Sequence, residues 1–190
     1  PFPTTDKETL EQLREWVDKD KAWAQHTMAG LYRDGKCGLK QAYVMAAMLF
    51  EKAVKQGDPS AMYELALLYA EGRGVAQSFE KTAELYAMAA EQGYARAMFN
   101  LGVLHSNGQG VAQSFETAAE FYTMAAEQGN DDAMCNLGML YIQGQGVDES
   151  LEVARKWFTK AANEENEQAV ANLQILGGID GKSTTTAPSI

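Results

Sequence analysis

The 36 residues 97–132 decide the fold, and they read AMFNLGVLHSNGQGVAQSFETAAEFYTMAAEQGNDD. The preceding residues, 61–96, read AMYELALLYAEGRGVAQSFEKTAELYAMAAEQGYAR, and 21 of the 36 aligned positions are identical. Self-similarity at a fixed period is typical of repeat proteins, in which each unit is one supersecondary element. Weaker copies occupy 24–60, which is one residue longer, and 133–168, and a half-copy occupies 169–178. The chain is therefore interpreted as four full repeats and an incomplete fifth.

Each repeat has the pattern of two helices joined by a glycine-rich turn. In residues 61–70 the apolar side chains recur at helical spacing, and Gly72 and Gly74 follow as helix-ending residues. A second helix is expected over 79–92, with Ser78 as its N-cap. One such hairpin cannot bury both of its faces, whereas stacked neighbours can. We therefore expect an all-α fold, a right-handed α/α superhelix (solenoid) of four helix-turn-helix repeats with capping half-repeats.

The N-terminal segment, residues 1–23, is expected to be a capping helix. Thr5-Asp6-Lys7-Glu8 has the pattern of a capping box, in which side chains satisfy the first backbone N–H groups of a helix. The apolar face that follows is predicted to hold four side chains, which are Leu10, Leu13, Trp16 and Val17.

The C-terminal end of the solenoid, which spans 24–178, is expected to be covered by the half-repeat. Its apolar residues are Leu173, Ile175 and Leu176. The pair Gly177-Gly178 is predicted to end the last helix, and residues 179–190 are predicted to form a flexible tail.

Composition excludes several classes of function. The chain has 190 residues, 16 of them basic and 26 acidic, and a net charge of −10. Nucleic acid is not an expected partner, because phosphate neutralisation needs clustered Lys and Arg. Membrane insertion is not expected either, since no apolar run approaches the roughly 18 residues of a spanning helix. The first residue is Pro1 rather than Met, the pattern of a trimmed chain or of a segment of a longer protein.

The recurring motifs resemble the Sel1-like repeat, a relative of the tetratricopeptide repeat, over residues 24–176. The pattern is Ala-x-x-x-Leu-Gly-x-Leu-Tyr, then Gly-x-Gly-Val, then Ala-x-x-(Trp/Phe)-Tyr-x-x-Ala-Ala-Glu-x-Gly. The third repeat carries it at Ala97, Leu101, Gly102, Leu104, Gly108, Gly110, Val111, Ala118, Phe121, Tyr122, Ala125, Ala126, Glu127 and Gly129. The resemblance implies a non-enzymatic adaptor or scaffold that binds a protein or peptide, and we expect a monomer.

By analogy with tetratricopeptide repeats, the first helices are expected to line a concave groove that binds a peptide or a helix of the partner. The candidate groove residues are Tyr63, Glu64, Leu67, Phe99, Asn100, Val103, Cys135, Asn136 and Met139. Each asparagine could bond a peptide backbone as donor and acceptor, or could instead bond its own neighbouring turn. Both alternatives are left open by the sequence.

A hydrolase of the β-lactamase type is the main alternative function. Some cysteine-rich Sel1-repeat proteins have been described as β-lactamases, and Ser78-Phe79-Glu80-Lys81 matches a Ser-x-x-Lys motif. The companion motifs of such enzymes are missing, and the third repeat has Ser114 with Thr117 in place of the lysine. A recurring serine at a helix start favours a cap, so we expect no enzyme. A structural repeat segment of a larger protein is the other alternative.

No metal or cofactor is expected, because the soft ligands His26, Cys37, His105 and Cys135 show no paired spacing. His105 is interpreted as a packed aromatic substitute, since it occupies a tyrosine position of the repeat. The two cysteines lie nearly three repeats apart, so we expect free thiols and a reducing compartment such as the cytoplasm. Finally, two glutamate stripes indicate either a solvated face or a dock for a basic partner; they are Glu80, Glu84 and Glu91, and Glu116, Glu120 and Glu127.

Overall fold

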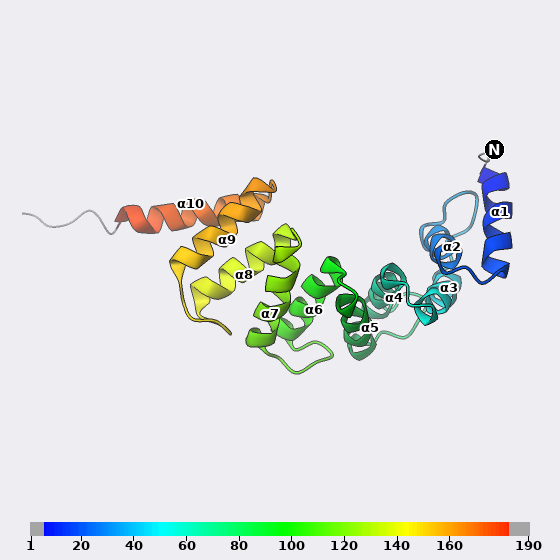
Figure 1. Cartoon of the computed structure of the whole chain (residues 1–190), viewed down its shortest axis with the longest axis horizontal. Helices are drawn as coiled ribbons and strands as arrows, with labels where there is room; N and C mark the ends of the chain where they lie inside the picture. The colour runs from blue at the N-terminus through cyan, green and yellow to red at the C-terminus, as the bar shows by residue number, and fades with distance from the viewer. Residues whose placement is uncertain (1–5, 183–190) are drawn as a thin grey trace, which may run out of the picture. The chain divides into compact units, whose positions relative to one another are not determined.

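The computed structural model describes residues 6–182, with side chains from 8 to 177, and this part of the chain is all-α (Figure 1). Nine of its ten helices are 13 residues long. The helices are α1 (Asp6–Asp18), α2 (Ala22–Asp34), α3 (Tyr43–Lys55), α4 (Pro59–Glu71), α5 (Phe79–Glu91), α6 (Ala95–Asn107), α7 (Phe115–Glu127), α8 (Asp131–Gln143), α9 (Leu151–Asn163) and α10 (Glu167–Lys182).

Successive helices pack as pairs, and each pair is one repeat. α2 packs against α3, α4 against α5, and α8 against α9, while α6 meets α7 through aromatic contacts. The described residues fall into two compact units, one of residues 6–97 with Gln109–Val111 and the other of Met98–Gly108 with residues 112–182. Within the first unit α1 packs on α2 and α3 on α4; within the second, α7 packs on α8 and α9 on α10. The predicted all-α repeat fold of the solenoid class is confirmed.

Serine N-caps precede three of the second helices, α5, α7 and α9, whereas Ala42 precedes α3 without a side-chain cap. The Ser78 hydroxyl oxygen accepts a hydrogen bond from the backbone N–H of Lys81 at 3.3 Å, and the same bond recurs from Ser114 to Thr117 at 3.1 Å. The Ser78 hydroxyl also donates to the Glu80 carboxylate at 2.9 Å. Bonds from the backbone N–H of Glu80 and from Ser78 lower the pKa of the Glu80 carboxyl below its ordinary value.

Substituting Ser78 by alanine should lower the free energy of unfolding by about 0.5–2 kcal/mol, because the N-cap acceptor is lost. The pKa of Glu80 should rise at the same time, since the hydroxyl that donates to its carboxylate is gone. Chemical denaturation and an NMR titration of Glu80 measure the two effects. Ser78→Asp, which keeps an acceptor, is the control; an equal loss of stability in both variants would contradict the capping role.

The second glycine of each Gly-x-Gly-Val turn touches the start of the preceding second helix. Gly146 has φ +70°, and a Cβ at this position would overlap the carbonyl group of Phe115 at the start of α7. A Cβ at Gly110 would likewise overlap the carbonyl group of Phe79 at the start of α5, and a Cβ at Gly74 would overlap that of Tyr43 at the start of α3. These glycines are therefore required both by backbone conformation and by close contact between successive repeats.

A buried aromatic column fills the interior of the repeats. Its members are Phe50, Tyr86, Tyr122 and Phe158, one from each second helix. A Cβ at Gly102 would lie 2.7 Å from the Tyr122 ring, and one at Gly138 would lie 2.7 Å from the Phe158 ring. The paired helices therefore approach each other closely at these two glycines.

The ends of the solenoid differ from two predictions. Leu10 and Leu13 are buried, but Trp16 is 40% exposed and its ring lies against Trp23 of α2 with centroids 6.0 Å apart. The predicted helix end at Gly177-Gly178 is wrong, because α10 continues to Lys182. Two glycines cost about 2 kcal/mol of helix propensity, yet they do not interrupt this helix.

The predicted apolar residues of the C-terminal half-repeat are only partly buried. Leu176 is buried as predicted, whereas Ile175 is 63% exposed and covers nothing. The capping box that begins at Thr5 and the part of the predicted tail beyond Lys182 lie outside the described residues. Within residues 6–182, none of the helices combines the length and the apolar character that a bilayer crossing requires.

Candidate partner-binding surface

The aromatic candidates on the first helices are half-buried and pack against the second helices. In the first unit, the ring of Tyr63 lies 5.6 Å from that of Tyr86 and 5.4 Å from that of Tyr94. In the second unit, Phe99 lies 5.9 Å from Tyr122 in the same way. These rings therefore contribute to packing within the repeats and present only part of their surface to a partner.

Glu64, also predicted to line the groove, is engaged within the protein. Its carboxylate is hydrogen-bonded and ion-paired with the Arg33 guanidinium of the preceding repeat. Arg33 also donates to Asp34 at 2.7 Å, and this bond lowers the pKa of the Asp34 carboxyl to about 2. A partner would therefore have to displace Arg33 to reach the Glu64 carboxylate. At this position the first unit presents charged side chains that already bond to each other. Leu67 is half-buried on the same helix.

An asparagine column runs through the later first helices at Asn100, Asn136 and Asn172. Asn172 accepts a hydrogen bond from Gln168 one turn earlier, at 3.3 Å. Its amide nitrogen reaches back to the preceding repeat, where it lies 3.6 Å from the Cys135 sulfur and 3.8 Å from the Met139 sulfur. For Asn172, then, the local bond and a bond between repeats occur together.

Cys135 does not offer its side chain to a partner, contrary to the expectation for the groove. The residue is only 5% exposed, and the Asn172 amide covers its thiol. Burial raises the pKa of this thiol above its ordinary value. Cys37 and Cys135 are both free thiols, as expected.

Asn136 and Met139 are brought together in one cavity of about 220 Å³, which we call the α6–α8 cavity. The other residues that line it are Ser106, Phe115, Tyr122, Leu140, Gln143 and Gln145. No charged side chain stands among these described lining residues, although the chain as a whole carries a net charge of −10. The cavity thus combines amides and hydroxyls with apolar side chains.

The polar side chains around the cavity differ in their hydrogen bonding. Ser106 donates to the backbone oxygen of Val103 at 2.9 Å, and the Tyr122 hydroxyl donates to Ser106 at 3.4 Å. Among the described residues, the half-buried Asn136 amide has no hydrogen-bond partner. An amide with both a free donor and a free acceptor matches the two groups of an extended peptide backbone.

Sequence reasoning missed several residues of this surface. The sequence assigns Tyr122 only to the repeat motif, and Gln145 belongs to the turn after α8. Asn172 could have been found, because it continues the 36-residue asparagine column. The Arg33–Glu64 pair has no such signal, since only the distance between two helices reveals it.

The alternative chemistry gains no support from the geometry around Ser78. The Lys81 ammonium lies 3.5 Å from the Tyr69 hydroxyl and 4.8 Å from the centre of its ring, and the Ser78 hydroxyl is engaged as an N-cap. His105 stacks on Phe121 with centroids 5.8 Å apart, so the prediction of a packed aromatic substitute is confirmed. In the part of the chain that the structure describes, no three His, Cys, Asp or Glu side chains gather as a metal site would need.

Comparison with protein families gives four matches to the Sel1 repeat, at residues 24–58, 59–94, 95–130 and 131–166. Together they span well over half of the chain. The family model starts the second, third and fourth repeats at residues 59, 95 and 131, each two residues before the repeat starts at 61, 97 and 133 in the sequence analysis. Curated protein sequences give no match to the chain.

Solved structures of Sel1-repeat proteins are similar to the chain. One is c5321, a protective antigen of uropathogenic Escherichia coli strains with an SLR fold, at 29% identity and a TM-score of 0.85 over 86% of this chain. The chain spans only 35% of that protein. A Sel1 repeat protein from Oxalobacter formigenes is 28% identical, with a TM-score of 0.83 over 87% of this chain and 68% of its own.

A cysteine-rich relative is similar in fold alone. Helicobacter pylori cysteine rich protein B is 24% identical, with a TM-score of 0.53 over 67% of this chain and 96% of its own. This chain has two cysteines, both free, so it does not share a cysteine-rich composition.

Proposed function

Because the chain belongs to the Sel1 repeat family, we propose that it is a non-enzymatic scaffold that binds a peptide segment of a partner protein. Sel1 repeats generally mediate protein interactions. The α6–α8 cavity is where we place the contact in the second unit. The observation that carries this assignment is the Asn136 amide, which stands without a hydrogen-bond partner among uncharged side chains.

The bound segment is expected to be extended and uncharged where it enters the cavity. An extended backbone offers N–H and C=O groups to Asn136, and the apolar wall of Met139 and Leu140 suits an aliphatic side chain. Met139 is unbranched and flexible, so it can adapt to side chains of different shape. The absence of charge among the described lining residues predicts an affinity that changes little with salt concentration.

A role without catalysis is supported by the hydrogen bonding of Ser78, the candidate nucleophile that the sequence suggested. Ser78 serves as a helix cap, and its supposed lysine partner is directed at Tyr69. Nothing in the α6–α8 cavity pairs a nucleophile with a base, because its polar residues are amides and hydroxyls. A nitrocefin assay on the wild-type chain and on Ser78→Ala should show no turnover in either.

Substitutions at Asn136 in the cavity and at Phe99, which packs on the cavity residue Tyr122, test the proposal. A random peptide library selected on the wild-type chain should enrich uncharged sequences, and Asn136→Ala combined with Phe99→Ala should weaken their binding by about 2 kcal/mol or more. Asn136→Ala alone should account for most of this loss and leave the melting temperature nearly unchanged, whereas Phe99 also packs on Tyr122 and should lower it. Calorimetric titration and thermal denaturation separate the two effects.

The control is Glu64→Gln, which changes the first unit and leaves the cavity intact. Its affinity for the same peptides should equal that of the wild-type chain. Selected peptides that bind equally well to Asn136→Ala would show that the cavity is not their site. A double variant that unfolds while each folded molecule keeps its affinity would contradict the assignment in the same way.

A further inference from the structure

The outer side of helix α3 differs from that of the other second helices. Val44, Met45 and Met48 are 59%, 43% and 52% exposed. Met48 follows Val44 by four residues and Met45 by three, so the three apolar side chains are neighbours on the helix surface. The other repeats carry mainly charged residues at these positions, which are Glu80, Lys81 and Glu84, then Glu116, Thr117 and Glu120, then Glu152, Val153 and Lys156. Packing within a repeat therefore does not require the apolar patch.

The same side of α3 is basic in its last turn. Lys52 and Lys55 follow Met48 by four and seven residues, so they lie on its side of the helix. Both lysines are exposed, and neither pairs with Glu51 or with any other side chain that the structure describes. We name this surface the α3 face, and its residues are Val44, Met45, Met48, Lys52 and Lys55.

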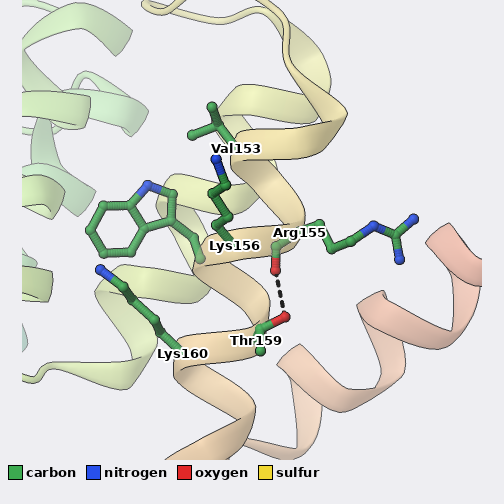
Figure 2. Close-up of a pocket in the computed structure, with 6 residues that line it drawn as sticks. Val153, Arg155, Lys156, Thr159 and Lys160 are labelled. Carbon is green, nitrogen blue, oxygen red and sulfur yellow. Dashed lines mark hydrogen bonds between the residues drawn. The ribbon is translucent and has the colours of Figure 1, made fainter.

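The fourth repeat shows how these positions are arranged around a second helix. Met48 and Lys52 align with Lys156 and Lys160 of α9. Figure 2 shows Lys156 and Lys160 on one side of that helix. Since α3 and α9 are helices of equal length in equivalent places, Met48 and Lys52 share one side of α3 in the same way.

A surface of complementary character lies on α7 in the second unit. It is a depression of about 470 Å³, which we call the α7 groove. Ala119, Met124 and Val147 supply apolar lining, and Met124 is 44% exposed. Glu116 and Glu120 belong to the same lining. Both glutamates are exposed, and neither is paired within the described part of the chain.

The α3 face and the α7 groove match in charge and in spacing. On α7 the two glutamates precede Met124 by four and eight residues, and on α3 the two lysines follow Met48 by four and seven. When the helices lie antiparallel with these methionines in contact, each lysine therefore meets a glutamate. Helix α5 matches less well, because Lys81 would repel the lysines of α3 and the Glu80 carboxylate already accepts a hydrogen bond from Ser78.

We propose that the α3 face of one copy of the chain binds the α7 groove of a second copy. The contact covers the apolar patch with Met124 and joins unpaired lysines to unpaired glutamates. A net charge of −10 repels two copies in most orientations, and this orientation offsets the repulsion locally. The interface is one helix against another, so we expect a Kd of about 0.1–1 mM. The monomer expected from the sequence then describes the chain in dilute solution.

Sedimentation of the chain at up to about 1 mM tests the association. The average mass of the wild-type chain should rise with concentration above the 20.8 kDa of one copy. Lys52→Glu with Lys55→Glu should raise the Kd by about tenfold or more, and so should Glu116→Lys with Glu120→Lys. An equimolar mixture of these two variants should associate again, because each supplies the native surface that the other lacks.

Two control variants make the same changes in net charge elsewhere. Lys19→Glu with Lys21→Glu reverses exposed lysines near the turn between α1 and α2, and Glu84→Lys with Glu91→Lys reverses exposed glutamates of α5. Both controls should associate with a Kd within about twofold of the wild-type value. Helical circular dichroism should confirm that all four variants fold.

Several results would overturn this assignment. A wild-type mass that stays at one copy up to about 1 mM would exclude the self-association. Equal losses in the control variants would show an effect of net charge alone. A mixture of the α3 and α7 variants that stays monomeric would show that the two surfaces do not meet. Loss of association in the α5 variant, with association kept in the α7 variant, would assign the α3 face to a different helix.

Discussion

Gly146→Ala should lower the free energy of unfolding of the second unit by about 3 kcal/mol or more. Two costs combine at this residue. Its φ of +70° is unfavourable for any residue with a Cβ, by about 1–2 kcal/mol. The new Cβ would also overlap the carbonyl group of Phe115, which is backbone and cannot turn aside as a side chain can. The contact between the Gly-x-Gly-Val turn and the start of α7 would have to open.

Gly129→Ala separates the two costs. Gly129 has φ +85°, but a Cβ there would meet no atom within 4 Å, so only the backbone term applies and a loss of about 1 kcal/mol is expected. Chemical denaturation followed by helical circular dichroism measures both variants. Because repeat arrays can lose cooperativity, hydrogen exchange in α7 and α8 should accompany it. Equal losses would contradict the role of the close contact.

Phe158→Ala should be at least as damaging, with an expected loss of about 3–5 kcal/mol. The ring is fully buried and fills the space left by Gly138 on the paired helix, so its removal opens a cavity that the two helices cannot close without moving. The hydrogen exchange of α8 and α9 should accelerate together, because each relies on this contact.

Two variants on the same helix serve as controls. Phe158→Leu keeps most of the apolar volume and should lose clearly less than Phe158→Ala. Trp157→Ala removes a larger side chain, but this residue is only half-buried, so a smaller loss is expected. If Trp157→Ala destabilised the protein as much as Phe158→Ala, the aromatic column would not be the main packing element of the fourth repeat.

The period of the sequence predicts the helices because each structural requirement recurs. In the second to fourth repeats, the serine N-caps, the positive-φ glycines of the turns and the small residues at helix crossings recur every 36 residues, whereas α3 of the first repeat begins after Ala42 without a side-chain cap. A helix that is ambiguous in one repeat can therefore be predicted from the aligned positions of the other repeats. The ends lack this support: Gly177 and Gly178 have no counterpart in a complete repeat, and the helix prediction was wrong there.

The candidate site was less predictable, because it depends on side-chain partners rather than on helix positions. Asn136 and Asn172 share one column, yet Asn172 bonds to its neighbours while Asn136 faces the α6–α8 cavity. Likewise Cys135 occupies the column of Tyr63 and Phe99 but is buried, since Asn172 covers it. Such differences between equal positions arise from the particular neighbours in each repeat.

The α6–α8 cavity is uncharged among its described residues and suits an extended backbone. Binding there should depend little on salt concentration, because screening acts on charge pairs and hardly on neutral hydrogen bonds.

Site-specific photocrosslinking tests the central claim, which is binding of a partner segment at the α6–α8 cavity. A photoreactive amino acid replaces Met139 in one variant and, as control, the exposed Met48 of α3 in another, and each is irradiated in a lysate of the source cells. We expect a protein partner to be linked from position 139 and not from position 48. A synthetic peptide covering its linked segment should bind the wild-type chain and lose about tenfold or more in affinity with Asn136→Ala. Linkage from position 48 alone, or a peptide that binds Asn136→Ala as well as the wild-type chain, would contradict the account.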